Sequence, residues 1–210
     1  MMRFVLVLLL GLAATACVSD RLGPSQPVSR PPAPIPAATE TGSHRVETIN
    51  LEFPAMLGEF GFVSRRRFRA RTEGDLLTYA FGPAYADIAI YDNARREIGT
   101  GPDSVAVKIE FEQSRQAFVA TIWPSQRQAG PLQLLREGMF PAEGDEKQIK
   151  FLEAAYRGAV AGKEHDTRVL LTGFRDQFIR VRLTAPTDLA TEKAAELDGF
   201  LKALAAILPL

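Results

Sequence analysis

Apolar and polar residues alternate along several short segments of the chain, which is the period of a half-buried β-strand. The clearest run is 49–53, where Ile, Leu and Phe alternate with Asn and Glu before Pro54 ends it. The same pattern predicts further strands at 62–71, 76–81 and 87–91. Nearer the C-terminus, 168–173 and 178–184 flank four turn-forming residues, so they predict a β-hairpin.

Other segments carry the helical spacing of apolar residues. Polar residues at 103–104 can cap a helix that ends before Pro124. The alternation of apolar residues within 105–111 would also suit a strand, and we favour the helix. Two further helices are predicted, at 146–160 and 188–208.

The order of these elements is strands, helix, helix, hairpin, helix. It predicts an α+β fold in which an antiparallel β-sheet has about three helices packed on it. In this order the chain resembles the α/β/α sandwich of the PsbP-like proteins. The resemblance is one of fold alone and carries no functional residues to this chain.

The first sixteen residues differ from the rest. Arg3 precedes an apolar run of thirteen residues, 4–16, which is short for a membrane-spanning helix and typical of a signal peptide. The run ends in Ala-Thr-Ala at 14–16, followed by Cys17. This ending resembles the lipobox of bacterial lipoproteins, in which the cysteine receives lipid and becomes the first residue of the mature chain.

This N-terminus has two interpretations, which predict different locations for the protein. The lipoprotein resemblance implies a lipid on Cys17, and Val18 in place of Asp implies the periplasmic face of the outer membrane. The alternative is an ordinary secretory signal, because Ala-Thr-Ala also fits the small-x-small rule of the general signal peptidase. That alternative predicts a soluble periplasmic protein with a free thiol at Cys17.

Residues 17–45 contain six prolines and few large apolar side chains, so they are expected to form a disordered linker after the lipidated cysteine. Its proline-rich part favours an extended spacer. Leu, Ile, Val and Phe recur from Val46 to the C-terminus, which predicts a single α+β domain over 46–210. The expected organisation is signal peptide 1–16, linker 17–45 and one folded domain.

The charge balance narrows the classes of partner. The 210 residues include 25 basic and 25 acidic side chains, whereas a dedicated nucleic-acid binder normally has a basic surplus. No nucleic acid is therefore expected. No cofactor is expected, and no metal either, because a metal site needs several converging ligands and the only second histidine, His44, lies in the linker. The expected contacts are the membrane, through the lipid anchor, and an envelope protein or an anionic glycan.

The candidate binding residues are arginines on two predicted strands. Strand alternation places one set on a single face, and the hairpin carries a second set. If the strands are neighbours, the two sets form a basic stripe that could hold an anionic partner. The other interpretation is a solvated face on which the arginines pair with cross-strand carboxylates. The residues are Arg65, Arg67, Arg69, Arg71, Arg180 and Arg182.

No motif in the chain indicates a catalytic centre. The Glu164-His165-Asp166 triplet is expected in an exposed loop rather than at a metal or acid–base site. We therefore expect a non-catalytic binding or assembly module of the envelope. The alternative is a hydrolase of peptidoglycan or another glycan that uses an Asp/Glu pair, since such acids need no fixed sequence spacing.

Overall fold

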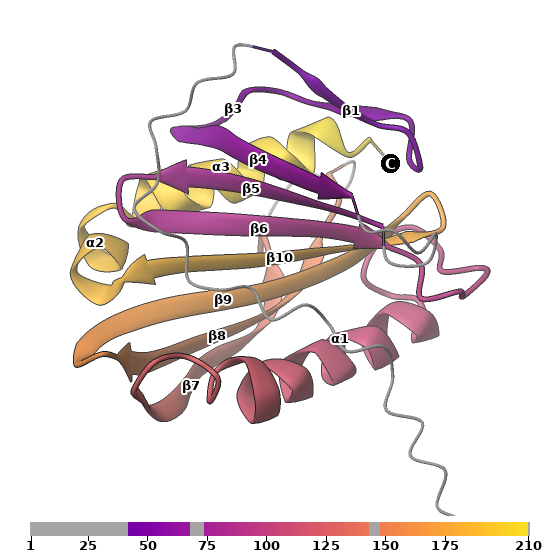
Figure 1. Ribbon diagram of the computed structural model, residues 1–210. Helices are drawn as coiled ribbons and strands as arrows, with labels where there is room; N and C mark the ends of the chain where they lie inside the picture. The colour runs from indigo at the N-terminus through magenta and orange to yellow at the C-terminus, as the bar shows by residue number, and fades with distance from the viewer. Residues whose placement is uncertain (1–41, 68–73, 143–147, 210) are drawn as a thin grey trace, which may run out of the picture.

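A computed structural model describes residues 42–67, 74–142 and 148–209. Its centre is an eight-stranded sheet in which every neighbouring pair of strands is antiparallel (Figure 1). A two-stranded hairpin, β1 (His44–Val46) with β2 (Leu51–Phe53), forms a second small sheet. In spatial order the large sheet contains β3 (Met56–Leu57), β4 (Phe60–Arg67), β5 (Asp75–Phe81), β6 (Ala84–Tyr91), β10 (Gln177–Pro186), β9 (Lys163–Phe174), β8 (Phe151–Val160) and β7 (Ala129–Phe140).

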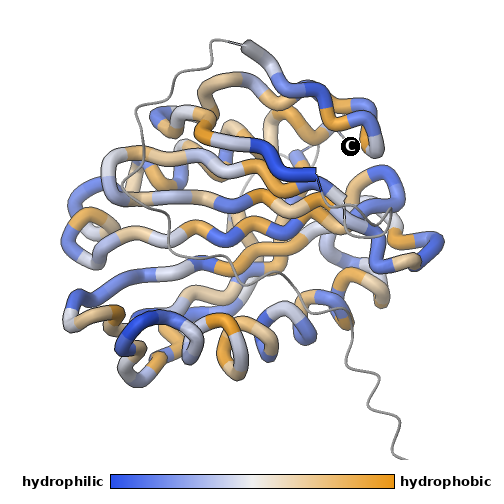
Figure 2. The backbone as a smooth tube through the Cα atoms, in the orientation of Figure 1, coloured by the Kyte–Doolittle hydropathy of each residue, from blue (hydrophilic) through white to orange (hydrophobic). Residues whose placement is uncertain are grey.

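Helices cover both faces of this sheet. The helix α1 (Val105–Ala117) continues into a short π-helix, η1 (Phe118–Ile122), and packs on one face, which we call the α1 face. The helices α2 (Thr187–Glu192) and α3 (Ala194–Ile207) pack on the other, which we call the α3 face. Hydrophobic residues are concentrated along the strands between these layers (Figure 2).

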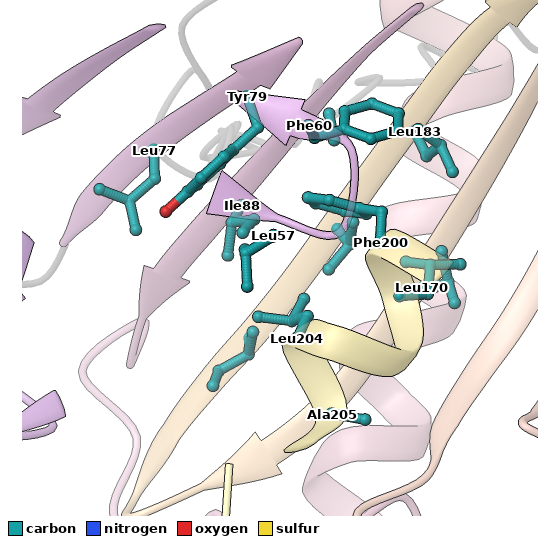
Figure 3. Packing of buried hydrophobic residues seen from close by; sticks show 14 of the residues in the cluster. Leu57, Phe60, Leu77, Tyr79, Ile88, Leu170, Leu183, Phe200, Leu204 and Ala205 are labelled. Carbon is teal, nitrogen blue, oxygen red and sulfur yellow. The ribbon is translucent and has the colours of Figure 1, made fainter. Parts of the chain in front are cut away.

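The larger hydrophobic core lies on the α3 face. Phe200 and Leu204 of α3 point toward the sheet, where they meet apolar side chains such as Leu57 and Ile88 (Figure 3). Phe53 from the β1–β2 hairpin belongs to the same cluster and is fully buried. Burial of such side chains contributes roughly 1.5–3 kcal/mol each, so this face anchors the helix and the hairpin together.

A second core lies beneath α1. Phe111 and Phe118 pack there with Trp123. The buried Glu110 accepts a hydrogen bond of 2.8 Å from the hydroxyl of Tyr91 on β6, so a polar contact also fixes the helix to the sheet. Burial, the largest cause, raises the pKa of Tyr91 to about 12.

The antiparallel sheet with packed helices confirms the predicted α+β class. The helix before Pro124 is confirmed, and Ser104 caps it by accepting a hydrogen bond of 3.1 Å from the Val107 amide. The C-terminal hairpin is confirmed as β9 and β10. The predicted helix at 188–208 is present but is divided into α2 and α3. The first strand begins at His44, within the predicted linker.

The predicted helix at 146–160 is wrong, because Phe151–Val160 is the strand β8. Both faces of β8 are covered, so apolar residues point both ways and the sequence loses its alternation. On the α3 face of β8 the buried residue Glu153 is charged rather than apolar. The remaining apolar residues are then spaced much as they would be along one face of a helix. The Glu164-His165-Asp166 triplet is likewise not a loop, since it lies in β9.

Candidate functional site

Arg65 and Arg67 lie on β4, on the α3 face. The Nε of Arg65 donates to the buried carboxylate of Asp75 on β5 at 2.9 Å, and the Nε of Arg67 lies 3.5 Å from the same oxygen. Arg65 also donates to the Arg45 carbonyl at 2.7 Å, and Arg67 reaches Glu47 at 3.4 Å. These arginines therefore tie the β1–β2 hairpin to the edge of the large sheet.

Arg180 and Arg182 lie on β10, on the α1 face. Arg182 donates to Asp87 of β6 at 2.6 Å, and that carboxylate also accepts a hydrogen bond of 2.9 Å from Thr78 of β5. The guanidinium of Arg180 lies over the ring of Tyr91, 5.3 Å from its centre. The predicted cross-strand pairing with carboxylates is thus present at Arg182.

The structure does not bring the two sets of arginines together. Two strands, β5 and β6, separate β4 from β10, and the two sets point to opposite faces. A β-bulge between Phe62 and Ser64 also changes the alternation, so that Phe62 shares a face with Arg65. The single basic stripe is therefore not formed by these four residues. Arg69, Arg71 and Cys17 lie outside the described residues.

A pocket of about 150 Å³ opens on the α3 face, between the strands β7, β8, β9 and β10 and the helices α2 and α3. Small and medium apolar side chains form part of its wall: Ala155, Leu183, Ala185, Ala190, Ala194 and Leu197. Four charged side chains also line it: Arg136, Asp166, Arg168 and Asp198. An apolar wall with a few polar groups is the usual composition of a ligand site.

The charged groups form a linked network centred on Arg168. Its Nε donates to Glu153 of β8 and its Nη1 donates to Asp198 of α3. Arg136 of β7 donates to both oxygens of Glu153, at 3.2 and 3.0 Å, and these hydrogen bonds raise the pKa of Arg136. The Arg168 guanidinium lies 4.7 Å from the centre of the Phe140 ring. One arginine therefore joins β7, β8, β9 and α3.

A second ion pair borders the same pocket. Arg157 donates to both oxygens of Asp166, at 2.7 and 2.8 Å, and this hydrogen bonding raises the pKa of Arg157. The hydroxyl of Thr187, the first residue of α2, donates to Asp166 at 2.9 Å. With Arg136 and Arg168, three arginines face three carboxylates, so the pocket and its rim have no net charge.

This arrangement bears on what the pocket can do chemically. Asp166 and Asp198 both line it, as a pair of hydrolytic carboxylates would, but each accepts hydrogen bonds from an arginine. A glycan hydrolase needs one carboxyl that can deliver a proton. The Nη2 of Arg168 is buried and has no hydrogen-bond partner among the described residues. The pocket therefore combines apolar surface with carboxylates that are held by arginines.

This site was not predicted from the sequence. The residues that pair in it are far apart along the chain: Arg168 is 15 residues from Glu153 and 30 from Asp198. Glu153 also lay in a segment predicted as a helix. Isolated arginines and carboxylates of this kind are common on protein surfaces, so only the sheet register shows that they converge.

Within the described ranges no group of three or more His, Cys, Asp or Glu side chains is placed to hold a metal ion. None of the helices in that part of the chain is long and apolar enough to cross a membrane.

No protein-family model matches the chain, and no curated protein matches it. The solution structure of cyanobacterial PsbP (CyanoP) from Synechocystis sp. PCC 6803 aligns with a TM-score of 0.47 and 10% identity, over 77% of this chain and 89% of that chain. The crystal structure of protein of unknown function PA94 from Pseudomonas aeruginosa aligns with a TM-score of 0.37 and 16% identity, over 80% and 96%. The chain has a weak similarity of fold to these proteins.

Proposed function

We propose that this protein is a lipoprotein of the bacterial envelope, anchored by Cys17, whose folded domain is a non-catalytic binding or assembly module. The observation that carries the proposal is the position of the one cysteine in the chain, directly after Ala14-Thr15-Ala16 at the end of the apolar run. Lipid on that residue would hold the mature protein at a membrane, and Val18 favours the outer membrane.

Two features of the folded domain support a binding role. The pocket between the strands and α2–α3 has apolar walls and charged groups of both signs, which suits a partner without strong net charge. Its carboxylates are held by arginines, as are Asp75 and Asp87 elsewhere in the sheet.

Labelling cells with radioactive palmitate tests the anchor. We expect the wild-type protein to carry the label and to occur in the membrane fraction. The Cys17→Ser variant should do neither, because the lipid is joined through the sulfur. Ser19→Ala is the matched control, since it leaves Cys17 and Val18 unchanged and should retain both. An unlabelled wild-type protein that stays in the soluble periplasmic fraction would overturn the proposal.

A further inference from the structure

The ion pairs beside the pocket form a row of alternating charges, which we call the charge row. Glu153 accepts hydrogen bonds from Arg136 and from Arg168. Arg168 also donates to Asp198. The charge row therefore begins with a positive group, Arg136, and ends with a negative one, Asp198. Glu153 within the row is buried, whereas the side chains of the two end residues are 58% and 42% exposed.

Both ends of the charge row have hydrogen-bonding capacity left over. Arg136 uses its Nε and Nη2 on Glu153, and its Nη1 has no partner among the described residues. Asp198 accepts at Oδ1, and its Oδ2 has no partner in the same part of the chain. A guanidinium carries several N–H donors and a carboxylate several acceptor sites, so each end can bind a further group.

The two ends of the charge row interact electrostatically but do not pair. Hydrogen bonding to Glu153 is the largest cause that raises the pKa of Arg136, and the negative charge of Asp198 raises this pKa further. No ion pair joins Arg136 to Asp198 within the residues that the structure describes. Both residues line the pocket. A ligand with one negative and one positive group would therefore meet an opposite charge at each end.

The apolar part of the pocket limits the size of such a ligand. Its wall includes four alanines, whose small side chains leave space between the strands and the helices: Ala155, Ala185, Ala190 and Ala194. A cavity of about 150 Å³ accommodates a molecule of about the size of benzene. A short apolar side chain fits this space, whereas a long acyl chain exceeds it.

We propose that this pocket binds a small zwitterion with a short apolar side chain, of the class of free α-amino acids. The ligand carboxylate accepts hydrogen bonds from Arg136, its ammonium group donates to Asp198, and its side chain packs among the alanines. Charge-assisted hydrogen bonds are stronger than neutral ones, and a ligand of either single charge would make them at one end only. The inference rests on the proposed binding function and names the ligand class.

Titration with L-valine and with D-valine, followed by NMR, tests the ligand class. The protein is the mature lipidated chain in detergent, labelled with carbon-13 in its alanine methyl groups. Ala155, Ala190 and Ala194 then report from the wall of the pocket. We expect at least one enantiomer to shift these signals. The dissociation constant should be millimolar, because both charged ends are partly exposed to water.

Two further probes separate the zwitterion from its parts. Isovalerate has the carboxylate and the branched chain of valine without the ammonium group, and isobutylamine has the amine without the carboxylate. Each should bind at least about threefold more weakly than valine, because one end of the charge row stays unfilled. Asp198→Asn should abolish the preference for valine over isovalerate, since an amide does not attract an ammonium group. A merely structural role of Asp198 would leave that preference unchanged.

Two neighbouring alanines of α3 supply a matched pair of variants. Ala194→Leu places a larger side chain in the pocket and should weaken valine binding at least about tenfold. The control is Ala195→Leu, which changes an equally exposed class of residue outside the pocket lining and should leave binding within about twofold. The signals of the remaining alanines show whether both variants are folded.

Three results would overturn the ligand class: no methyl shift with either enantiomer, isovalerate or isobutylamine binding as tightly as valine, or equal affinities of Ala194→Leu and Ala195→Leu. Palmitate labelling tests the anchor separately. A labelled protein that binds no valine would contradict the ligand class alone, whereas an unlabelled protein that binds valine would contradict the anchor alone.

Discussion

Arg168 connects elements that are distant in the sequence. It bonds Glu153 on β8 and Asp198 on α3, and its guanidinium lies against Phe140 at the end of β7. Glu153 is almost fully buried, and its carboxylate is paired with this arginine and with Arg136. Removing one partner of a buried ion pair leaves a carboxylate poorly compensated, which is the costly half of such an interaction.

We therefore predict that Arg168→Leu lowers the free energy of unfolding by about 2 kcal/mol, less than for an isolated buried pair because Arg136 still reaches Glu153. Adding Glu153→Gln to that variant should restore part of the loss, because the uncompensated charge is gone. Urea denaturation of the two variants and the wild type measures both effects. Equal stability of Arg168→Leu and the wild type would show that the network contributes nothing.

For individual residues, the sequence predicted that arginines make the polar contacts but did not predict which residues surround them. The four described arginines of the predicted stripe, two on each strand, lie on β4 and β10, and Arg182 pairs across strands with Asp87. Their separation by two strands depends on which strands pair, and a bulge at Phe62–Ser64 shifts the alternation on β4. Neither strand order nor a bulge leaves a signal in a single sequence.

The attachment of α1 to the sheet depends on a close approach of two backbones. Gly101 before the helix exchanges two hydrogen bonds, of 2.8 and 3.2 Å, with Gly173 of β9. A Cβ on Gly173 would lie 2.3 Å from the carbonyl oxygen of Gly99, and a backbone atom cannot move aside cheaply. The residue at 173 must therefore have no side chain for the loop to reach the strand.

We predict that Gly173→Ala destabilises the protein by about 2 kcal/mol or more, since overpacking of a closed contact forces a backbone shift. The matched control is Gly138→Ala on β7, where a Cβ would meet nothing within 4 Å and the effect should stay within about 0.5 kcal/mol. Thermal unfolding followed by circular dichroism compares them. Similar losses in both variants would contradict the close approach.

The hairpin β9–β10 and the helix α1 were predicted correctly, and the strands β7 and β8 were not. The hairpin β9–β10 was identified by its turn, and α1 by its cap at Ser104. In β8 apolar residues such as Leu152 and Ala155 point to opposite faces, which removes the period of two. The edge strand β7 shows little alternation because both of its faces are exposed, and no strand was predicted there.

We propose that the whole molecule combines a lipid anchor, a spacer and a binding domain. Among the described strands β7 forms one edge of the large sheet, and a pocket lies beside it. If Cys17 carries lipid, the residues between it and β1 set how far these surfaces extend from the membrane. A proline-rich chain spans about 3.1 Å per residue when extended, so this distance would be several tens of ångströms.

The most direct test of this account is the mass of the N-terminal peptide of the mature protein, purified from membranes and digested with protease. We predict a peptide that begins at Cys17 and carries the added mass of a diacylglycerol and a further acyl chain. A peptide that begins at Cys17 with an unmodified thiol, or one that retains residues 1–16, would contradict the lipid anchor.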